Sequence, residues 1–323
     1  MTSPSLPPDA APRTDVAVII VSYRSLTDIA GCLAALEKST WGRFRVVICE
    51  NGGEEAFQKL RAALPERLKG GQPVDLLSAP GNPGYAGGIN LAMERTPPAD
   101  AYWILNPDTQ PEPGALEALM ARLDRGGCSA VGHDLLSGDG RLASRGGVWR
   151  KWSARAISLD KGKPWQPIPD IRALEKRINY ITGASLLVTR GFCQRAGKMR
   201  DDYFLYCEEV EWCLRAIGRG EKLGYAPDAF VRHAQGTATG SGGTLRTQSK
   251  LAVYLMERNR ILLTRDLYPA LMPVTVPLSL LHIAIKYAKA AAWRQGCYAL
   301  SGWFAGLANK RNKPDWLERG AAH

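Results

Sequence analysis

The sequence predicts an α/β protein with a doubly wound sheet, a mixed second half and an amphipathic helical appendage at its C-terminus. Three observations support this fold class. Short apolar runs alternate with segments of helical spacing in the first third of the chain, the polar residues cluster where those runs end, and the last quarter is basic. With 323 residues and 45% apolar side chains, the chain can bury a large core.

The first unit is a strand, a helix and a second strand. Asp15–Val21 is an almost continuous apolar run, typical of a buried strand, and Thr27–Lys38 follows it with apolar residues at helical spacing. Phe44–Cys49 is the second strand, and Glu54–Leu64 is the next helix. We expect the two strands to pair in parallel through a right-handed connection.

The alternation continues with a third strand, a helix entered through glycines and a fourth strand, at Val74–Ser78, Tyr85–Met93 and Tyr102–Leu105. Sheets of this kind bind their ligands beyond the carboxyl ends of the strands. Between Ala130 and Arg190 the pattern changes to short strand-like segments, which indicates a mixed half-sheet or insertion that shapes a second pocket.

Positive charge is concentrated near the C-terminus. The chain has 42 Lys+Arg and 31 Asp+Glu, a net charge of +11, and residues 245–323 hold 12 basic and 4 acidic side chains, a net charge of +8. This excess favours negatively charged partners such as phosphorylated ligands or anionic lipid.

One segment of the basic region is apolar enough to concern a membrane. Leu267–Ile285 holds 19 residues without Lys, Arg, Asp or Glu, close to a membrane span, but Pro269, Pro273 and Pro277 interrupt it. We therefore expect a pair of helices lying in the plane of an anionic membrane surface rather than a straight spanning helix. A helical appendage packed on the domain, or a dimer interface, is the alternative.

These patterns divide the chain into a disordered start at 1–14, an α/β domain at 15–245 and a helical, membrane-associating region at 246–323. The start is rich in Pro, Ser and Ala and lacks the apolar stretch of a secretion signal, and Gly236–Gly243 is expected to be a mobile loop. The seven cysteines lack paired metal-ligand spacing, as is typical of reduced thiols. We expect a cytoplasmic protein, peripheral on the inner face of the plasma membrane.

Residues at the strand ends are candidates for binding a nucleotide diphosphate. Ser22 and Tyr23 could hold a base by hydrogen bonding and stacking, and Glu50 could accept a hydrogen bond from a base imide or a ribose hydroxyl. A carboxylate after a strand is also a common turn former or helix cap.

Gly81–Asn90, with the sequence GNPGYAGGIN, is a candidate for contact with phosphates. Its glycines let the backbone approach a ligand, and Asn82 and Asn90 offer amides at the start of a helix, where anions are favoured. The segment matches neither the dinucleotide fingerprint nor the phosphate loop with its Lys, which disfavours a nicotinamide enzyme or an ATPase. A glycine-rich helix entry without a ligand is the alternative.

Asp108 follows a buried strand and Pro107, where it could bind Mg²⁺ or Mn²⁺ between two phosphates. Such a cation would act as a Lewis acid on a leaving diphosphate. His233, beside the glycine-rich loop, could be a second ligand, although a lone histidine is more often structural.

An acidic and aromatic segment, Asp201–Arg215, leads into a helix expected to start near Glu208. Acids in a first helical turn suit the helix dipole, which accounts for Glu208, Glu209 and Glu211 without any catalysis. A carboxylate at a helix start also suits a general base that removes the proton of an attacking hydroxyl. We assign that role to Glu209.

In order and spacing these motifs resemble glycosyltransferase family 2, inverting enzymes with the GT-A fold, and particularly its rhamnosyltransferase-like branch in bacterial surface polysaccharide synthesis. The resemblance runs over about three-quarters of the chain, Val16–Pro269. The motifs that carry it are VSY, CENGG, NPGYAGGIN, LNPD, ITGASLLVTR, FLYCEEVEWCLR, the strand of His233 and ERNRILL.

The resemblance implies a GT-A domain, Rossmann-like with a mixed sheet, that moves rhamnose or a hexose from a nucleotide-diphosphate donor to a lipid-linked or glycan acceptor, with no nucleic-acid partner. The residues expected to contact the nucleotide sugar are Ser22, Tyr23, Glu50, Asn82, Gly84, Gly88, Asn90, Asn106 and Asp108. Those expected on the acceptor side are Gly183, Ala184, Glu208 and Trp212. Glu209 would be the base, Asp108 and His233 the ligands of Mg²⁺ or Mn²⁺, and the basic motif Arg258-Asn259-Arg260 would face phosphate or lipid headgroups.

The chain departs from the family pattern at three places. Glu50 stands where many members have Asp, Glu208-Glu209 replaces the usual Glu-Asp pair, and Asn106 replaces the first acid of the metal motif, as in the rhamnosyl branch. Two other functions remain open: a sugar nucleotidyltransferase, although the Arg- and Gly-rich loop that it needs is absent after the first strand, and a noncatalytic nucleotide-sugar or membrane-binding subunit of a polysaccharide assembly complex.

Overall fold

The structure is a computed structural model that describes residues 15–234 and 243–319. The predicted disordered start at 1–14 lies outside the described residues. So does the predicted mobile loop Gly236–Gly243, apart from Gly243 itself.

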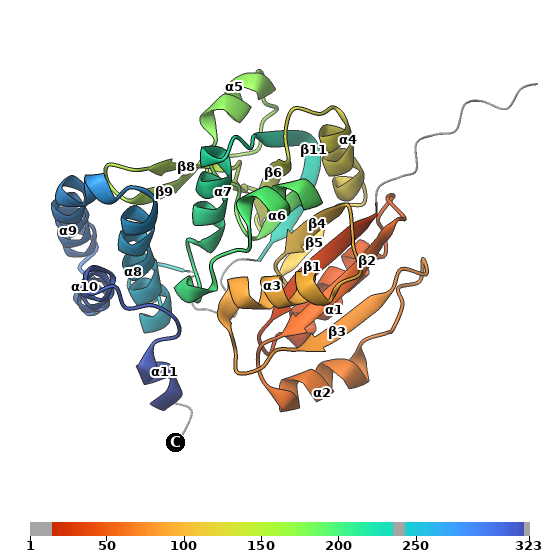
Figure 1. The fold of residues 1–323 in the computed structure, drawn as a ribbon, viewed down its shortest axis with the longest axis horizontal. Helices are drawn as coiled ribbons and strands as arrows, with labels where there is room; N and C mark the ends of the chain where they lie inside the picture. Colours follow the sequence, from red (N-terminus) through yellow and green to blue (C-terminus); the bar gives the residue numbers. More distant parts are fainter. Residues whose placement is uncertain (1–14, 235–242, 320–323) are drawn as a thin grey trace, which may run out of the picture.

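One mixed sheet carries the fold, with the strand order β3-β2-β1-β4-β10-β6-β11-β5 and with β7 paired to β6 (Figure 1). Its first half is parallel and consists of β1 (Val16–Ser22), β2 (Phe44–Glu50), β3 (Val74–Ser78) and β4 (Ala101–Leu105). The four predicted strands are confirmed, with every boundary within one residue. The predicted mixed second half is also confirmed, because β10 (Ser185–Thr189) runs antiparallel to β4.

The unbroken apolar runs are explained by burial on both faces of the sheet. In β1, Ala17, Ile19 and Val21 pack into the cluster on one face, whereas Val18 and Ile20 pack into the cluster on the other. Parallel strands covered by helices on both sides have this composition. The helices in this part of the chain are α1 (Leu26–Leu36), α2 (Glu54–Ala63), α3 (Gly84–Arg95) and α4 (Ala115–Asp124).

The second half of the α/β domain mixes short strands with short helices. The strands are β5 (Thr109–Pro111), β6 (Ala130–Ser137), β7 (Leu142–Ser144) and β11 (Leu223–His233), together with a separate hairpin of β8 (Gly147–Arg150) and β9 (Arg155–Ser158). The helices are α5 (Ile171–Arg177), α6 (Arg190–Ala196), the 3-10 turn Asp201–Tyr203 and α7 (Glu208–Gly218).

The C-terminal region is helical, as predicted, and lies along one side of the domain (Figure 1). Its elements are α8 (Lys250–Leu267), the 3-10 turn Pro269–Leu271, α9 (Met272–Lys289), α10 (Trp293–Leu307) and α11 (Asp315–Arg319). Helices α8 and α10 pack closely, because a side chain at Gly302 would overlap the backbone of Tyr254. The β8–β9 hairpin reaches α9, where the Thr275 hydroxyl donates to the Lys151 carbonyl at 3.2 Å.

The prolines do not interrupt α9, contrary to expectation. Pro273 lies in its first turn, where no backbone N–H is needed. Pro277 lies inside the helix, where it removes one backbone donor, yet the helix continues to Lys289. The stretch Pro269–Lys289 is long and apolar enough to cross a membrane by length and composition, and 22% of its most apolar part is buried.

Candidate active site

The topology brings the sequence-predicted residues to one edge of the sheet. Because β10 is antiparallel to β4, its start meets the end of β4, and the Asn106 N–H donates to the Ala184 carbonyl at 3.0 Å. The Gly183 carbonyl accepts a hydrogen bond from the Tyr85 hydroxyl at 2.6 Å. The segment predicted for the acceptor side therefore lies between the end of β4 and the start of α3.

Asp108 and His233 come together at the same edge. Strands β5 and β11 pair antiparallel, which places the His233 Nε2 3.0 Å from the Asp108 Oδ1 and 3.5 Å from the Asn106 Nδ2. Both the Asp108 and the His233 side chains are largely buried, 8% and 12% exposed. The two residues predicted to bind a metal ion are thus neighbours, although the sequence separates them by more than a hundred positions.

Glu208 and Glu209 open helix α7 beside this edge. A side chain built at Gly183 would lie 3.5 Å from the Cβ and Cγ atoms of Glu209, so the predicted acceptor segment lies next to the predicted base. Burial raises the pKa of the Tyr85 hydroxyl, and the charges of Glu208, Glu209 and Asp108 raise it further. Tyr85 therefore lies within electrostatic reach of all three carboxylates.

The two glutamates differ in how the protein treats their charge. Burial, and then the charge of Glu209, raises the pKa of Glu208 to about 8, and its Oε2 is buried without a hydrogen-bond partner among the described residues. Burial also raises the pKa of Glu209, but backbone N–H groups that include those of Gly183 and Val210 oppose the rise. The backbone N–H groups therefore favour a negative charge on Glu209, whereas Glu208 holds a proton near neutral pH.

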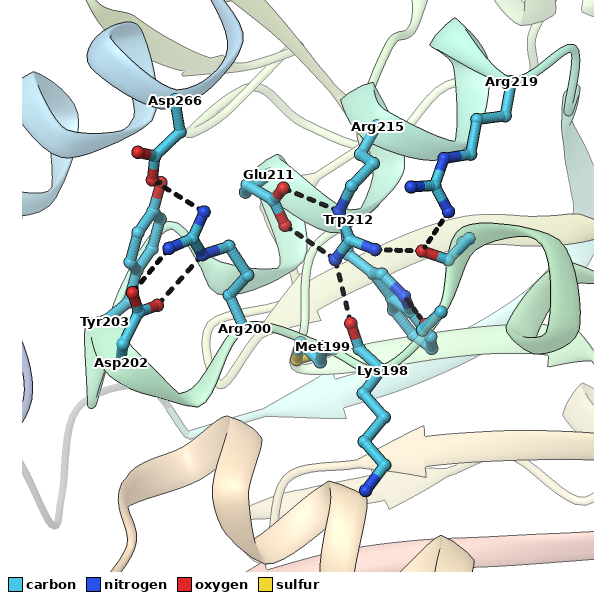
Figure 2. A network of polar contacts seen from close by, with 12 residues as sticks. Lys198, Met199, Arg200, Asp202, Tyr203, Glu211, Trp212, Arg215, Arg219 and Asp266 are labelled. Atoms are coloured by element: carbon cyan, nitrogen blue, oxygen red, sulfur yellow. Dashed lines mark hydrogen bonds and ion pairs between the residues drawn. The ribbon is translucent and has the colours of Figure 1, made fainter.

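The third acid of the helix is already paired. The Arg215 guanidinium donates to both oxygens of Glu211, at 2.7 and 2.9 Å, and also to the Lys198 carbonyl at 2.9 Å (Figure 2). Glu211 is 1% exposed. Its charge is therefore neutralised inside the protein, which leaves Glu209 as the carboxylate available to a substrate.

Replacing Glu208 by glutamine should change the pH dependence of stability. The folded-state pKa of this acid is raised, so the folded protein binds more protons than the unfolded chain between pH 4.5 and 8. Its contribution to stability is therefore lost as pH rises through that window. We expect the free energy of unfolding of Glu208→Gln, measured by urea denaturation, to rise relative to that of the wild type between pH 5 and pH 9. An advantage independent of pH would show that Glu208 is not protonated in the folded state.

The Ser22 and Glu50 side chains, predicted to contact a base or a ribose, point into the protein. Both are 0% exposed, and the Ser22 hydroxyl donates to the Glu50 carboxylate. The other Glu50 oxygen accepts from the Arg24 and Gly52 N–H groups at 3.0 and 2.6 Å. Glu50 is thus a turn former, whereas Tyr23, 46% exposed at the end of β1, remains open for stacking.

The glycines of the Gly81–Asn90 segment serve close packing. Gly84 has a φ of +79°, and a side chain there would overlap the Phe204 carbonyl, which accepts a hydrogen bond from the Tyr85 N–H. A side chain at Gly88 would press on Val21 in β1. Within this segment, the Asn82 side chain accepts from the Gly84 N–H at 3.2 Å. These glycines let α3 lie against β1 and against the loop before α7.

Asn90 and Trp212 have structural partners, which differs from their expected roles. The Asn90 amide makes two hydrogen bonds with the backbone of Met199, at 2.7 and 3.1 Å. Trp212 is 1% exposed, packs edge-on against Phe192, and its indole N–H donates to the Gly197 carbonyl at 2.8 Å. The polar group of each side chain is hydrogen-bonded to backbone atoms, so both residues join neighbouring segments of the chain.

The Arg258-Asn259 pair corrects another expectation. Instead of facing phosphate or lipid, the two side chains are 1% and 0% exposed and hold the loop before α7. The Asn259 amide donates to the carbonyls of Tyr203, Leu205 and Tyr206 at 3.0, 2.8 and 2.8 Å, and Arg258 donates to the Tyr203 carbonyl at 2.7 Å.

The loop held in this way is strained and is tied to the C-terminal region. Phe204, Tyr206 and Cys207 all have positive φ, which costs about 1 kcal/mol or more for each residue. Figure 2 shows Arg200 between Asp202 and Asp266, with ion pairs of 2.6 and 3.2 Å. Helix α8 thereby fixes the position from which Glu208 and Glu209 project.

Sequence reasoning missed Tyr85 and Tyr180 as site residues. Tyr85 lies inside the NPGYAGGIN motif and Tyr180 directly before ITGASLLVTR, and periodicity gives no indication that either lies near Glu209. Burial raises the pKa of Tyr180, and the charges of Glu209 and Cys207 raise it too, whereas Arg260 lowers it. Tyr85 therefore lies near Asp108 and the base, and Tyr180 lies near the base and Arg260.

The sequence profile described as "Glycosyl transferase family 2" matches residues 17–181, half of the chain. The chain belongs to glycosyl transferase family 2. It is a glycosyltransferase, and the resemblance seen in its motifs is confirmed.

Two curated relatives of this family 2 enzyme are transferases. The low-salt glycan biosynthesis hexosyltransferase Agl10 of Haloferax volcanii is 21% identical over 260 residues, which are 79% of this chain and 76% of the relative. The N-acetylglucosaminyl-diphospho-decaprenol L-rhamnosyltransferase of Mycobacterium tuberculosis is 26% identical over 249 residues, which are 70% of this chain and 78% of the relative.

Solved structures share the fold of this family 2 enzyme. S. aureus TarS in complex with UDP-GlcNAc aligns with a TM-score of 0.59 at 12% identity, over 91% of this chain and 80% of that one. GalNAc-T7 with UDP, GalNAc and Mn²⁺ aligns at 0.56 and 15% identity, over 77% of this chain and 51% of that one. Mannosyltransferase PcManGT of Pyrobaculum calidifontis, with GDP-Man and Mn²⁺, aligns at 0.53 and 15% identity, over 94% and 91%. The predicted GT-A fold is confirmed.

Proposed function

We propose that this family 2 enzyme transfers a rhamnosyl or hexosyl group, with inversion, from a nucleoside-diphosphate sugar to a hydroxyl of a lipid-linked acceptor at the cytoplasmic face of a membrane. One observation carries the proposal: Glu209 lies beside Gly183, and the segment Gly183-Ala184 is hydrogen-bonded both to Tyr85 and to Asn106, two residues before Asp108. A base at Glu209 and a diphosphate site at Asp108, on either side of the transferred sugar, would suit a single displacement.

The chemistry is one in-line step. Glu209 removes the proton of the acceptor hydroxyl, and the oxygen attacks the anomeric carbon on the face opposite the diphosphate. The bond from the anomeric carbon to the phosphate oxygen breaks, and the nucleoside diphosphate leaves with the electron pair. The protonated Glu208 beside the base adds no second negative charge to the cleft.

The residues at the sheet edge fit a divalent cation. Asp108 and His233 offer a carboxylate oxygen and an imidazole nitrogen 3.0 Å apart, the spacing expected of two ligands on one ion. No group of three His, Cys, Asp or Glu side chains gathers as a metal site in the described ranges, so the donor phosphates would complete the coordination. A bound Mn²⁺ or Mg²⁺ would supply charge neutralisation for the departing diphosphate.

Two features support a membrane-bound acceptor. Helix α9 exposes a row of large apolar side chains spaced for one helix face: Val274, Leu278, Leu281 and Ile285, each 43% exposed or more. On α10, Trp293 and Phe304 are 68% and 60% exposed. The mycobacterial relative is named for a diphospho-decaprenol acceptor. An apolar face beside basic residues is typical of a helix that lies on an anionic bilayer.

The function is tested by a screen of nucleoside-diphosphate sugars. We expect one donor to raise the unfolding temperature and to release its nucleoside diphosphate when an extract of bacterial lipid-linked sugars is added. Transfer with retention of the anomeric configuration, read by NMR of the product, would overturn the proposed mechanism. Donor binding without any turnover would instead indicate a noncatalytic subunit.

The cation site gives a separate prediction. Asp108→Asn should weaken the Mn²⁺-dependent binding of the nucleoside diphosphate by about tenfold or more, because one charged ligand is lost. The measurement is calorimetric titration with and without Mn²⁺. Asp100→Asn, the same change at an exposed residue before the other end of β4, is the control. Equal Mn²⁺ dependence in both variants would remove Asp108 from the cation site.

A further inference from the structure

A cluster of basic side chains lies between β9, α8 and α9. Its members are Arg155, Arg260, His282 and Lys286. They are accompanied by one acid, Glu257, whose Oε1 lies 2.7 Å from the Arg260 Nη1 and 3.7 Å from the Lys286 Nζ. Figure 1 shows the three elements side by side, with the β8–β9 hairpin next to α8 and α9.

The cluster is enclosed by protein. The side chains of Glu257, Arg260 and Lys286 are 4%, 18% and 23% exposed. Burial lowers the pKa of Lys286, and although Glu257 opposes the shift, Arg260 and Arg155 lower it further. Burial, Arg155, Arg260 and Lys286 also lower the pKa of His282. The cations therefore repel one another, and one carboxylate, Glu257, pairs with two of them.

Such an excess is costly unless an anion joins it. Three permanent cations and one carboxylate leave a net charge of two in a partly dehydrated place, where unpaired charges are strongly unfavourable. A phosphate or diphosphate group would satisfy Arg155, Arg260 and Lys286 with charge-assisted hydrogen bonds.

The cluster is next to the catalytic base. Burial raises the pKa of the Cys207 thiol and the charge of Glu209 raises it further, whereas Arg260 lowers it. Tyr180 has the same two neighbours. Asp108 is not among the charges that act on these two groups, whereas it acts on Tyr85. Glu209 and Arg260 therefore both lie within electrostatic reach of Cys207 and Tyr180.

The cluster also adjoins the apolar face of α9. His282 and Lys286 directly follow Leu281 and Ile285, two members of the exposed apolar row. A ligand that carried a sugar, a phosphate group and a lipid in that order would find the base, the cations and the apolar row in the same order.

We infer that Arg155, Arg260, His282 and Lys286 bind the phosphate group that links the acceptor sugar to its lipid. The inference rests on the proposed function and assigns it an acceptor class, a glycosyl phospholipid or diphospholipid. The site holds the acceptor by its phosphate, so that the sugar hydroxyl lies at Glu209.

The test is calorimetric titration of the full chain with inorganic pyrophosphate, in EDTA, so that no cation holds the probe at Asp108. We expect binding in the wild type, and about tenfold weaker binding in Lys286→Gln and in Arg155→Gln, the loss of one charge-assisted hydrogen bond. Lys289→Gln in α9 and Arg150→Gln in β8 remove the same charge outside the cluster and should bind as the wild type does. Equal binding in all four variants, or none in the wild type, would overturn the inference.

A second arm separates an acceptor phosphate from bulk lipid headgroups. Sedimentation with vesicles of phosphatidylcholine and phosphatidylglycerol should retain Lys286→Gln and Lys289→Gln equally, because the cluster is too enclosed to meet a flat bilayer. A selective loss for Lys286→Gln would assign the cluster to headgroups. Donor hydrolysis is measured in parallel: its absence from the wild type would contradict the proposed function, whereas the pyrophosphate result would still decide the site.

Discussion

Glu209→Gln is expected to lower kcat for sugar transfer by roughly 10²- to 10⁴-fold, the usual contribution of a general base. The amide keeps the shape of the side chain but cannot take the acceptor proton. Donor binding should survive, because the substitution leaves Asp108, His233 and Tyr23 in place. The measurement is single-turnover transfer, with the dissociation constant of the donor determined by calorimetry.

Two further variants make this result specific to Glu209. Glu208→Gln replaces a carboxyl group that is largely protonated near neutral pH by an uncharged amide of similar shape, so it should retain most transfer activity there. Glu211→Gln breaks the Arg215 pair and should act mainly through stability. Normal turnover in Glu209→Gln together with inactive Glu208→Gln would move the base to Glu208.

Asn259→Asp is expected to be the most destabilising conservative change in the chain. The amide of Asn259 donates to three carbonyls of the loop before α7, and a carboxylate would face all three with no donor. Arg258 still donates to the Tyr203 carbonyl, so the carbonyls of Leu205 and Tyr206 are the two that lose their side-chain donor. Each buried acceptor left unpaired costs about 1–3 kcal/mol, so we expect a loss of roughly 2 kcal/mol or more in the free energy of unfolding. Urea denaturation measures this loss.

The same variant should lose activity in the fraction that remains folded, because the loop positions the start of α7. A displacement of about 1 Å at a catalytic group can cost roughly 100-fold in rate. Asn309→Asp is the matched control, since Asn309 is exposed and its oxygen accepts from Arg311. A stable, active Asn259→Asp would show that the loop keeps its shape without the amide.

The first half of the fold could be predicted because its information is local. Strand β1 is buried on both faces, so every position in Val16–Ser22 is apolar or small, and the run is readable without knowledge of its neighbours. The pairing of β10 against β4 follows from no local pattern. This pairing is set by contacts between strands that lie far apart in the sequence. It is the pairing that brings Gly183 and Ala184 to the edge where β4 ends.

The candidate site was predictable in its residue types but less so in their orientation. Asp108 and His233 were expected near one cation, and they are neighbours. Glu50, Asn90 and Trp212 also lie in motifs that carry the family resemblance, yet their polar groups are satisfied by backbone or by buried partners. A motif shows that a residue type is needed at a position, and tertiary contacts decide whether ligand or chain makes use of it.

The loop between Tyr203 and Cys207 makes the α/β domain and the C-terminal helices depend on each other. Side chains of α8 hold this loop in its shape. The C-terminal helices, which we propose meet a lipid, therefore also set the position of Glu209. An exchange of C-terminal regions between related enzymes, made to redirect one to another acceptor, would therefore have to carry this loop along. A change in the C-terminal helices that alters the choice of acceptor would therefore also be expected to alter the rate of transfer.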